Sequence, residues 1–444
     1  MVKLTGVFSQ ISSHKVMVVG DFLLDTYTIG KARRISPEAP VAVVHVQREE
    51  RRPGGAGNVV LNLVSLGAEV VAVGRVGQDI AGESLRRSLD EEGVNTAGIY
   101  TQDGFFTPVK NRVLAENQQI VRVDYESNTE IPESLENEVI ASLPALLEGI
   151  KIVAISDYGK GFLSRKVLST LISLAKAMGI PVIADPKGID FTKYSGTTVI
   201  KPNLGEAYAA ANLLPDVPLE QAAQRILKVA DADYLMVTRS EAGISIFHRD
   251  GQRHDFPVRV REVKDVTGAG DTVLAMLTCA MANGLPITTA ALLSNVAAGI
   301  AIERFGCARI SLADLARRLL EEDVGNKVFD DDHLFALQQV LHERQFTLLS
   351  IDGSSGLTSP IFNAIRKLAH SNADLLVYVR DLHPDSEFVS LLASLHEVNF
   401  ILLKSENLRT LCLSILPKEV YSVESGMLTS VAALDDLLDD SLFA

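Results

Sequence analysis

Residues 265–272, Asp-Val-Thr-Gly-Ala-Gly-Asp-Thr, join a turn of small residues to a carboxylate just before a long apolar run. If that run is a helix, the turn contributes backbone N–H groups that have no partner inside the helix, at the positive end of its dipole. Such a position binds a phosphate group. The carboxylate of Asp271 beside that phosphate would accept a proton from a nucleophilic hydroxyl. The octapeptide therefore indicates phosphoryl transfer to a small hydroxylated molecule.

Two other interpretations of the octapeptide remain open. It is compatible with a simple loop in which the aspartate caps the helix. Gly268-x-Gly270 also matches the beginning of a dinucleotide-binding fingerprint, but the sixth position is Val273 rather than Gly or Ala, which disfavours that interpretation. From these eight residues alone, a phosphate site and a helix cap are about equally supported.

The elements that would position this turn form a regular alternation of strands and helices. Short apolar runs that bracket helical patterns predict a doubly wound, mostly parallel sheet, an α/β fold. The expected strands are 15–20, 151–156, 181–185, 197–201 and 234–238, and the expected helices are 57–66, 80–92, 164–178, 219–230, 269–282 and 288–304.

Polar motifs follow the expected strands of this sheet. Ligands of open α/β sheets bind at the carboxyl ends of the strands, so residues that follow several strands converge on one site. The sequence therefore predicts a ligand site at this edge. The motifs concerned are Gly20-Asp21, Ser156-Asp157, Asp185-Pro-Lys187, Lys201-Pro-Asn203 and Thr238-Arg-Ser240.

The remaining segments predict a small sheet and a second domain. Residues 41–46 and 106–125 alternate polar and apolar side chains, as half-exposed strands do, and we expect them to form a small separate sheet. The kinase-like domain would span 1–320, followed by an acidic linker at 321–332. A second βα pattern at 333–444 predicts a small α/β domain of three to five strands that ends in an acidic amphipathic helix.

Composition excludes several classes of function. A formal net charge of −14 argues against nucleic acid or an anionic membrane as the main partner. The three cysteines and nine histidines lack the spacings of a disulfide framework, a zinc site or a metal hydrolase. No apolar stretch of membrane-spanning length and no signal peptide is recognisable, so we expect a cytoplasmic chain. A local basic pocket stays possible, or else a solvated surface, formed by Arg33, Arg34, Arg51 and Arg52.

Further motifs accompany the Gly-Ala-Gly-Asp turn, and together they carry a family resemblance. They are Gly20-Asp21 with Asp25, Arg34-Ile-Ser-Pro-Glu-Ala-Pro40, Arg52-Pro-Gly-Gly-Ala-Gly-Asn58, Asn117-Gln-Gln-Ile-Val-Arg122, Asp185-Pro-Lys-Gly188, Pro202-Asn-Leu-Gly-Glu206 and Thr238-Arg-Ser240. Over about residues 10–320 the chain resembles the ribokinase-like carbohydrate kinases. Within them it is most similar to the kinase half of the bifunctional heptose 7-phosphate kinases/adenylyltransferases of lipopolysaccharide-core synthesis.

The resemblance implies ATP and Mg²⁺ as cofactors and assigns roles on the nucleotide side. Asp271 would be the catalytic base, and the amides of Gly268, Ala269 and Gly270 would form an anion hole over the transferring phosphoryl group. An Asn-x-x-Glu element would place Mg²⁺ and its waters, and Mg²⁺ does favour few direct protein ligands. That element consists of Asn203, Leu204, Gly205 and Glu206. Further residues expected to line the nucleotide are Lys187, Thr238, Ser240, Gly243 and Asn295.

On the sugar side, the resemblance implies hydroxyl and phosphate contacts. Expected to meet sugar hydroxyls are Asp21, Asp25, Asn58 and Asp124, with Gly54 and Gly55 allowing a close backbone approach. Expected to hold a terminal phosphate are Lys110, Arg112 and Arg122. A charged outer strand face is an almost equally good interpretation of Lys110 and Arg122, and a flexible turn is the alternative for the two glycines.

The implied reaction is phosphorylation of D-glycero-D-manno-heptose 7-phosphate at O1 by ATP, which gives the 1,7-bisphosphate. The small sheet would act as a lid and as the contact of a homodimer, with no nucleic-acid or membrane partner. Two alternatives remain: a kinase of the same fold with another sugar acceptor, and a catalytically silent nucleotide- or sugar-binding protein.

The carboxyl-terminal part departs from the bifunctional relatives. Their adenylyltransferase domain has a His-x-Gly-His turn after its first strand, whereas here residues 351–361 contain no histidine. The segment Gly353-Ser-Ser-Gly356 is suited to an anion or is a plain serine-rich turn, and we favour the turn. We therefore predict a degenerate nucleotidyltransferase-like domain in which adenylyl transfer is absent.

Overall fold

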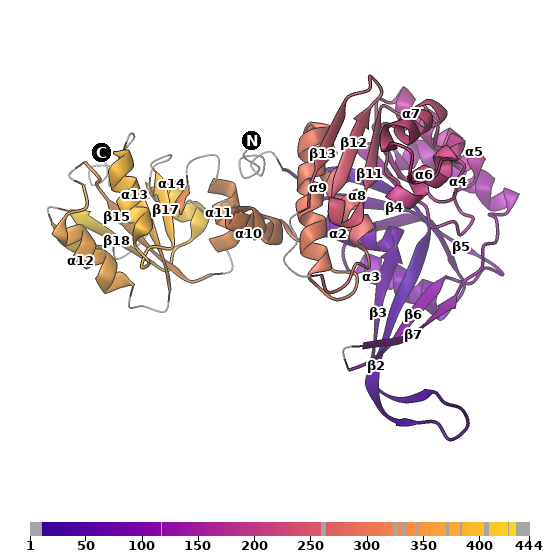
Figure 1. Cartoon of the computed structure of the whole chain (residues 1–444), viewed down its shortest axis with the longest axis horizontal. Helices are drawn as coiled ribbons and strands as arrows, with labels where there is room; N and C mark the ends of the chain where they lie inside the picture. Colours follow the sequence, from indigo (N-terminus) through magenta and orange to yellow (C-terminus); the bar gives the residue numbers. More distant parts are fainter. Residues whose placement is uncertain are drawn as a thin grey trace. The chain divides into compact units, whose positions relative to one another are not determined.

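The computed structural model describes residues 11–116, 118–258, 263–322, 327–329, 334–341, 344–354, 356–369, 373–381, 384–403, 408–424 and 426–431. These residues form two compact units that divide between Ser311 and Leu312 (Figure 1). The predicted boundary at 320 falls inside helix α10 (Leu312–Glu322), and the predicted linker contains the short strand β14 (Val328–Phe329). The acidic helix expected in the last residues lies outside the described residues.

The first unit is built on a nine-stranded sheet in the order β13-β12-β11-β10-β9-β8-β1-β4-β5. Its pairings from β5 to β11 are parallel, while β12 and β13 add an antiparallel edge. The predicted mostly parallel sheet is thus confirmed. The strands are β1 (Lys15–Gly20), β4 (Glu69–Gly77), β5 (Asn95–Gln102), β8 (Ile152–Ser156), β9 (Val182–Asp185), β10 (Val199–Ile200), β11 (Tyr234–Thr238), β12 (Ile244–His248) and β13 (Arg253–Phe256).

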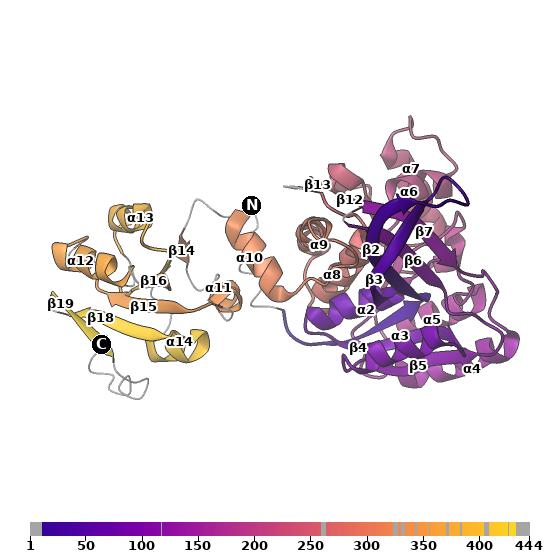
Figure 2. The ribbon, with the colours of Figure 1, turned by 90° about the horizontal axis from the view of Figure 1, so that it is seen from below.

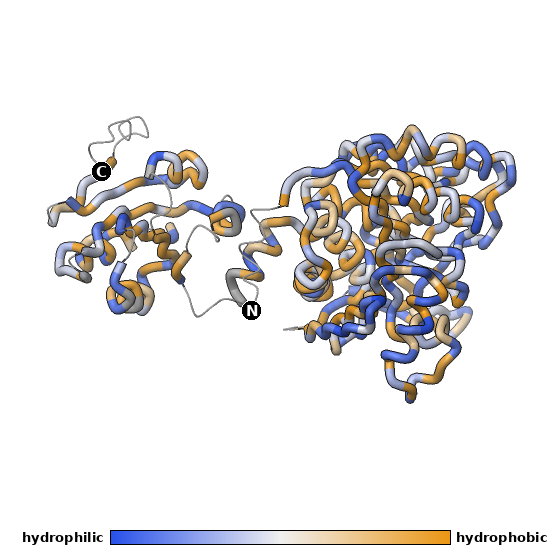
Figure 3. Tube along the Cα trace, turned by 90° about the horizontal axis from the view of Figure 1, so that it is seen from above, coloured by the Kyte–Doolittle hydropathy of each residue, from blue (hydrophilic) through white to orange (hydrophobic). Residues whose placement is uncertain are grey.

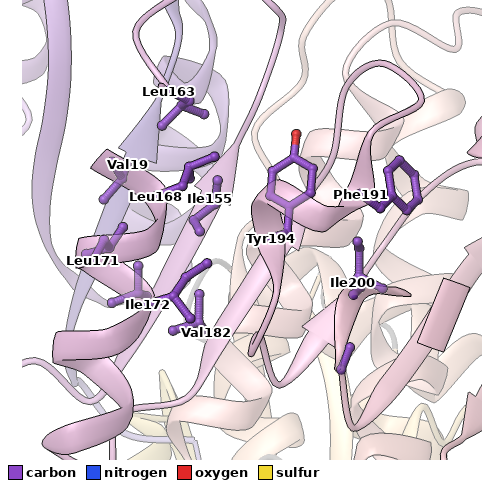
Figure 4. Close-up of a cluster of buried hydrophobic side chains, with 14 of the residues drawn as sticks. Val19, Ile155, Leu163, Leu168, Leu171, Ile172, Val182, Phe191, Tyr194 and Ile200 are labelled. Carbon is purple, nitrogen blue, oxygen red and sulfur yellow. The ribbon is translucent and has the colours of Figure 1, made fainter. Parts of the chain in front are cut away.

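Helices cover both faces of this sheet because its central strands are apolar on both sides. In β1, Met17 and Val19 pack into a core with α4 (Glu133–Leu146), α5 (Arg165–Ala177), α6 (Leu204–Ala211) and α7 (Leu219–Ala230) (Figures 2 and 4). Side chains alternate along a strand, so Val16 and Val18 point to the opposite face, where all their surface is also buried. Packed together on that side are α2 (Ala56–Ser65), α8 (Ala269–Ala282) and α9 (Ile287–Ile302), while α3 (Ile80–Asp90) lies next to β5.

A separate four-stranded sheet, which we call the lid, extends from the first unit (Figure 1). Its strands are β2 (Phe22–Ile35), β3 (Ala42–Gly55), β6 (Val109–Ala115) and β7 (Gln118–Tyr125), in the order β3-β2-β6-β7. The predicted small sheet is confirmed, but β2, which continues almost directly from β1, was not anticipated. The first half of β2 is buried and its last residues are exposed, so its sequence shows no single hydrophobic periodicity.

The second unit contains a six-stranded sheet in the order β14-β17-β16-β15-β18-β19, so the expected three to five strands were too few. Apolar clusters lie on both faces of this sheet, and apolar segments run through both units (Figure 3). In neither unit do the described helices include one long and apolar enough to cross a membrane. The elements are β15 (Phe346–Ile351), β16 (Asp374–Val379), β17 (Phe400–Leu403), β18 (Glu419–Glu424), β19 (Met427–Val431), α11 (Leu334–Leu341), α12 (Ser359–Leu368), α13 (Ser386–Ser394) and α14 (Leu408–Ile415).

Candidate active site

Asp271 lies in the first turn of α8 and is buried, with 4% of its surface exposed. Its Oδ2 accepts a hydrogen bond from Nδ2 of Asn58 at 2.8 Å, and its Oδ1 accepts one from the hydroxyl of Tyr158 at 2.6 Å. Gly268 precedes the helix with φ of 78°, and a Cβ there would come within 2.7 Å of Nδ2 of Asn58. The turn therefore requires glycine both for its backbone conformation and for its contact with Asn58.

Burial raises the pKa of Asp271 from 3.8 to about 6. Hydrogen bonds from Asn58 and Tyr158 stabilise the charged form and oppose this rise, as does the nearby ammonium group of Lys201, whereas the charge of Asp185 adds to it. A carboxylate with a pKa near 6 is ionised at neutral pH and still has appreciable affinity for a proton. Asp271 is therefore suited to act as a general base.

The turn at the start of α8 contains the amides that were expected to form an anion hole. The amides of Gly270 and Asp271 lie in the first turn of α8, where a helix offers them no internal acceptor. The amide of Ala269 donates instead to the carbonyl of Val266 at 3.3 Å, a long bond within the turn. The turn must therefore give up that bond before all the predicted amides can face one phosphoryl group.

The strand ends bring together the polar residues that the sequence placed there. Oδ2 of Asp21 accepts hydrogen bonds from the amides of Tyr158 and Lys160 at 3.0 and 2.9 Å, which ties the end of β1 to the segment after β8. After β10, Lys201 is 2% exposed and its ammonium group is 2.9 Å from Oδ2 of Asp185, at the end of β9. Burial raises the pKa of both Asp21 and Asp185. The ion pair of Lys201 with Asp185 and the buried carboxylate of Asp21 thus lie at the edge of the sheet from which Asp271 also receives a hydrogen bond.

Asn203 and Glu206, the predicted magnesium residues, form a capping box at the start of α6. Oδ1 of Asn203 accepts the amide hydrogen of Glu206 at 2.9 Å, and the glutamate side chain accepts that of Asn203 at 3.0 Å. Lys187 lies 2.8 Å from Oε1 of Glu206. Within the described ranges no three His, Cys, Asp or Glu side chains gather closely enough to hold a metal ion. These residues fit a hydrated Mg²⁺ that arrives with a nucleotide, not a cage of protein ligands.

The other candidate nucleotide residues lie around the end of β11. Thr238 bridges to Asn203, which brings the β11 end beside the capping box, and Ser240 follows in a left-handed conformation with φ of 51°. The side-chain amide of Asn295 donates to the carbonyls of Phe256 and Pro257 at 3.2 and 3.0 Å. Asn295 thus fixes the chain after β13 in this structure. Leu204 and Gly205 lie exposed in the first turn of α6, and Gly243 is buried beside the carbonyl of Phe256.

On the lid side, Asp25 is buried and forms an ion pair with Arg112, whose guanidinium also lies over the ring of Tyr27. A Cβ on Gly54 would lie 2.1 Å from Oδ2 of Asp25, and one on Gly55 would lie 2.7 Å from a backbone oxygen. The close approach that these glycines permit is therefore between the end of β3 and the chain from Asp21 to Asp25. Arg112, expected to bind a phosphate, already has a carboxylate partner.

The remaining predicted lid residues separate into two groups. The ammonium group of Lys110 lies 5.5 Å from the ring centroid of Tyr158, so Lys110 reaches the neighbourhood of Asp271. Arg122 and Asp124 lie instead on β7, a strand whose residues are all exposed, and they pair with each other at 2.9 Å. This arrangement corresponds to the charged strand face that was the alternative for Arg122.

A cavity of about 470 Å³ lies between the lid and the segments around residues 265 and 305. Gly306 lines the cavity, and the sulfur of the next residue, Cys307, lies 3.5 Å from Oδ2 of Asp25. A Cβ on Gly268 would also be 3.3 Å from that sulfur. The charged side chains of the lining are Arg48, Arg52, Arg112, Lys264, Glu50, Glu116 and Asp265.

Three residues that were not predicted from the sequence lie at this candidate site: Tyr158, which donates to Asp271, and Arg48 and Lys264, which line the cavity. For Tyr158 a signal existed, because it directly follows the Ser156-Asp157 motif at a strand end. Arg48 was hidden in a charged stretch of β3, next to the arginines that were considered. Nothing local marks Lys264, which reaches the cavity only through the tertiary fold.

Comparisons with known proteins agree with this architecture. The sequence pattern of the pfkB family carbohydrate kinases matches residues 13–315. The chain is 45% identical over 312 residues to the bifunctional protein HldE of Trichlorobacter lovleyi, a match that covers 70% of this chain and 64% of that protein. It is 37% identical over 423 residues to the bifunctional protein HldE of Geotalea uraniireducens, a match that covers 91% of this chain and 86% of that protein. The chain thus spans less than two thirds of the first relative and most of the second.

Solved structures share the fold at lower identity. Phosphofructokinase-2 of Escherichia coli, in complex with potassium, superimposes with a TM-score of 0.59 at 21% identity, covering 70% of this chain and 99% of that one. Ribokinase of Arabidopsis thaliana, in complex with ribose and ATP, superimposes with a TM-score of 0.54 at 18% identity, covering 69% of this chain and 99% of that one. These likenesses concern the fold, and they confirm the predicted ribokinase-like architecture for the part of the chain that they cover. The predicted additional carboxyl-terminal α/β unit is the second compact unit of the structure.

Proposed function

The chain belongs to the pfkB family of carbohydrate kinases, and from that premise we propose that it phosphorylates a sugar phosphate with ATP. The proposed acceptor is D-glycero-D-manno-heptose 7-phosphate, and the product is the 1,7-bisphosphate. The observation that supports this proposal most strongly is the buried carboxylate of Asp271 at the start of α8, with both oxygens held by hydrogen-bond donors. A carboxylate in that position is what transfer to a hydroxyl requires.

The proposed step is an in-line displacement. The O1 hydroxyl of the sugar gives its proton to Asp271 while its oxygen bonds to the γ-phosphorus of ATP and the bond from that phosphorus to the β–γ bridging oxygen breaks. ADP leaves with the electron pair of that bond. The first-turn amides of α8 donate to the transferring phosphoryl oxygens, where negative charge is concentrated.

The nucleotide end of the site would use residues at the ends of β9, β10 and β11. Mg²⁺, when bound with ATP, neutralises phosphate charge. Glu206 and Asn203 would orient its waters through the oxygens of the capping box, and Lys187 would turn from Glu206 toward a phosphate. Thr238, Ser240, Gly243 and Asn295 would surround the nucleoside.

The sugar phosphate end of the site would use the lid cavity. Asn58 is bonded to Asp271, and Asp21 is bonded to the backbone of Tyr158, whose side chain reaches Asp271; both residues would meet sugar hydroxyls. The terminal phosphate would lie in the cavity, where Arg48 and Arg52 are both paired with Glu50, at 3.0 and 2.8 Å, and Lys264 lines the other wall. A dianionic phosphate can compete with a single carboxylate for two arginines. Arg122 has no part in this proposal, because it pairs with Asp124 on the exposed β7.

A homodimer through the lid is part of the same proposal. Apolar side chains on β7 are exposed in the single chain, and an exposed edge strand is prone to pair with another chain. The side chains concerned are Ile120, Val121, Val123 and Tyr125. Sedimentation of the intact chain should give a dimer, and Val121→Lys should give a monomer of unchanged secondary structure.

Adenylyl transfer is proposed to be absent from this chain, although the relatives named above are bifunctional. In the turn after β15 the amide of Gly353 donates to Oδ2 of Asp381 at 2.6 Å, and a Cβ on Gly353 would lie 2.6 Å from the ring of Phe388. An amide that already binds a carboxylate, in a turn that also holds Asp352, is a poor site for nucleotide phosphates.

One set of assays tests these proposals. Purified chain, MgATP and a panel of sugars with and without terminal phosphates should give ADP with the heptose 7-phosphate, and Asp271→Asn should lose about 10²–10⁴-fold in turnover while it still binds ATP. Equal turnover of sugars that lack the phosphate would identify another acceptor, and ATP binding without any turnover would indicate a silent binding protein. Formation of ADP-heptose from heptose 1-phosphate would contradict the proposed loss of adenylyl transfer.

A further inference from the structure

Tyr158 makes hydrogen bonds to two aspartates at the edge of the main sheet, Asp21 and Asp271. It lies in the segment between β8 and α5, where its backbone amide donates to Oδ2 of Asp21 at 3.0 Å. Its hydroxyl donates to Oδ1 of Asp271 at 2.6 Å. The backbone of Tyr158 is thus fixed at the end of β1, and its side chain reaches the first turn of α8.

The hydroxyl of Tyr158 is a donor in this contact because it keeps its proton. Burial, and then the negative charge of Asp271, raise the pKa of Tyr158 well above 10. An O–H donor held against an ionised carboxylate stabilises the charge on that carboxylate. Because the bond is made to one oxygen, it also restricts rotation of the carboxylate.

We propose that Tyr158 is a positioning residue of the phosphoryl transfer: its hydroxyl orients the carboxylate of Asp271 and keeps it ionised in a buried site. This inference rests on the proposed role of Asp271 as the base. An ionised carboxylate accepts about four hydrogen bonds, so the donors Asn58 and Tyr158 leave lone pairs for the proton of the acceptor hydroxyl. Tyr158 itself need not touch the reacting atoms.

Among the described groups around Asp271, only Asn58 shares this function, through its own hydrogen bond to the other carboxylate oxygen. Asp185 raises the pKa of Asp271, and Lys201, which lowers it, is already paired with Asp185. Burial raises the pKa of Cys307, so its thiol stays neutral. Asn58, on α2, makes the second hydrogen bond. Lys110 lies over the ring of Tyr158, with its ammonium group 5.5 Å from the ring centroid.

Tyr158→Phe tests the proposal, because it removes one oxygen and keeps the ring. The acid limb of the kcat/KM profile should move up by about one to two pH units, since the lost hydrogen bond is one to a charged group. At neutral pH turnover should therefore fall about two- to tenfold and recover at alkaline pH, with the KM for ATP unchanged.

Tyr194→Phe is the matched control. The hydroxyl of Tyr194 also donates to a buried carboxylate at 2.6 Å, but the acceptor is Oδ2 of Asp157. It should lower stability to a similar extent and leave the acid limb in place. A loss of kcat in Tyr158→Phe that is equal at all pH values, or a limb that moves equally in both variants, would overturn the proposal.

Carbon-13 NMR of protein labelled at aspartate side-chain carboxyls separates this inference from the proposed function. The Asp271 signal, identified by its loss in Asp271→Asn, should titrate near pH 6 in the wild type and at higher pH in Tyr158→Phe. If this shift occurs but no sugar phosphate is turned over, the proposed function fails and the inference about Tyr158 stands. An unchanged titration of Asp271 in Tyr158→Phe would refute the inference whatever the acceptor.

Discussion

The side-chain amide of Asn58 donates to Oδ2 of Asp271 at 2.8 Å across 213 positions of sequence. The two residues lie on α2 and α8, which pack side by side on the same face of the main sheet. Nδ2 of Asn62 donates to both the backbone oxygen and Oδ1 of Asn58, at 3.0 and 3.2 Å. Oδ1 is thereby held as an acceptor, so the amide hydrogens of Asn58 face the carboxylate. A chain of buried amides thus holds one oxygen of the Asp271 carboxylate in place.

Asp271→Asn should make the protein more stable at neutral pH while it removes most turnover. The pKa of Asp271 is about 6 in the folded chain against 3.8 for a free aspartate, so its ionised form destabilises the fold. One pKa unit corresponds to about 1.36 kcal/mol, which gives a gain of about 3 kcal/mol in the free energy of unfolding. The hydroxyl of Tyr158 can turn to accept from the new amide. Urea unfolding at about pH 7.5 measures this gain.

The sign of this effect is set by proton binding. The folded state binds the proton of Asp271 more tightly than the unfolded state does. Asp271 therefore costs no free energy of unfolding below pH 3.8, where it is protonated in both states. The loss of stability grows from pH 3.8 to about 6 and is constant above that. The gain of the asparagine variant should therefore vanish at about pH 4. Equal stability of the two proteins at all pH values would contradict the raised pKa.

The sequence predicted β1 and α8 at their observed bounds. Each is a continuous apolar run that stops at a conspicuous break, Gly20 for the strand and the Gly-Ala-Gly-Asp turn for the helix. An element that is buried on both faces has a continuous apolar sequence, which can be recognised without knowing which elements pack against it. β2 was missed because its environment changes along its length, from core at Phe22 to solvent at Ile35, and hydrophobic periodicity reports only a constant environment.

The contacts inside the site were less predictable than its members. The sequence placed Asp185 and Asp271 at the edge of the sheet, but the donors that satisfy Asp271 come from α2 and from the segment after β8. The partner of Arg112 could not be known either, because its pairing with Asp25 depends on the register of β2 against β6. Residue type and spacing identify a site, whereas hydrogen-bond partners follow from tertiary packing.

Gly268→Ala should lower kcat more than tenfold because the new Cβ would lie 2.7 Å from Nδ2 of Asn58. Asn58 would have to move, and Asp271 would lose one of its donors. The left-handed backbone of residue 268, with φ of 78°, adds a strain of about 1–2 kcal/mol to any residue with a Cβ. Steady-state kinetics together with thermal unfolding separate the two effects.

Gly284→Ala provides the control for this backbone strain. Gly284 has φ of 73°, and a Cβ at this position would have no atom within 4 Å, so only the conformational penalty applies. The variant should lose a similar amount of stability and retain its kcat. A comparable loss of kcat in both variants would mean that the contact with Asn58 does not matter.

Arg52→Ala should raise the KM for the sugar phosphate by about tenfold or more, with little change in the KM for ATP, because a charge-assisted hydrogen bond to a phosphate is lost. Arg52 lines the lid cavity, whereas its neighbour Arg51 pairs with Glu49 and is not part of the lining. The two side chains are similarly exposed, at 45% and 47%. Arg51→Ala is therefore the control and should behave as the wild type. Equal KM values in the two variants would remove the cavity from the acceptor site.

Lys201→Met should destabilise the protein by about 3 kcal/mol at neutral pH, because it leaves the carboxylate of Asp185, whose pKa is already raised by burial, without its ammonium partner. The cost comes from the unpaired charge, so adding Asp185→Asn should recover most of it. The ion pair between Asp190 and Arg165 serves as the control, since both side chains are more than half exposed. Asp190→Asn should change stability by less than about 1 kcal/mol. Denaturant unfolding of the four proteins measures these changes. If the double variant is no more stable than Lys201→Met alone, the edge of the sheet tolerates an unpaired carboxylate and the ion pair has no structural role.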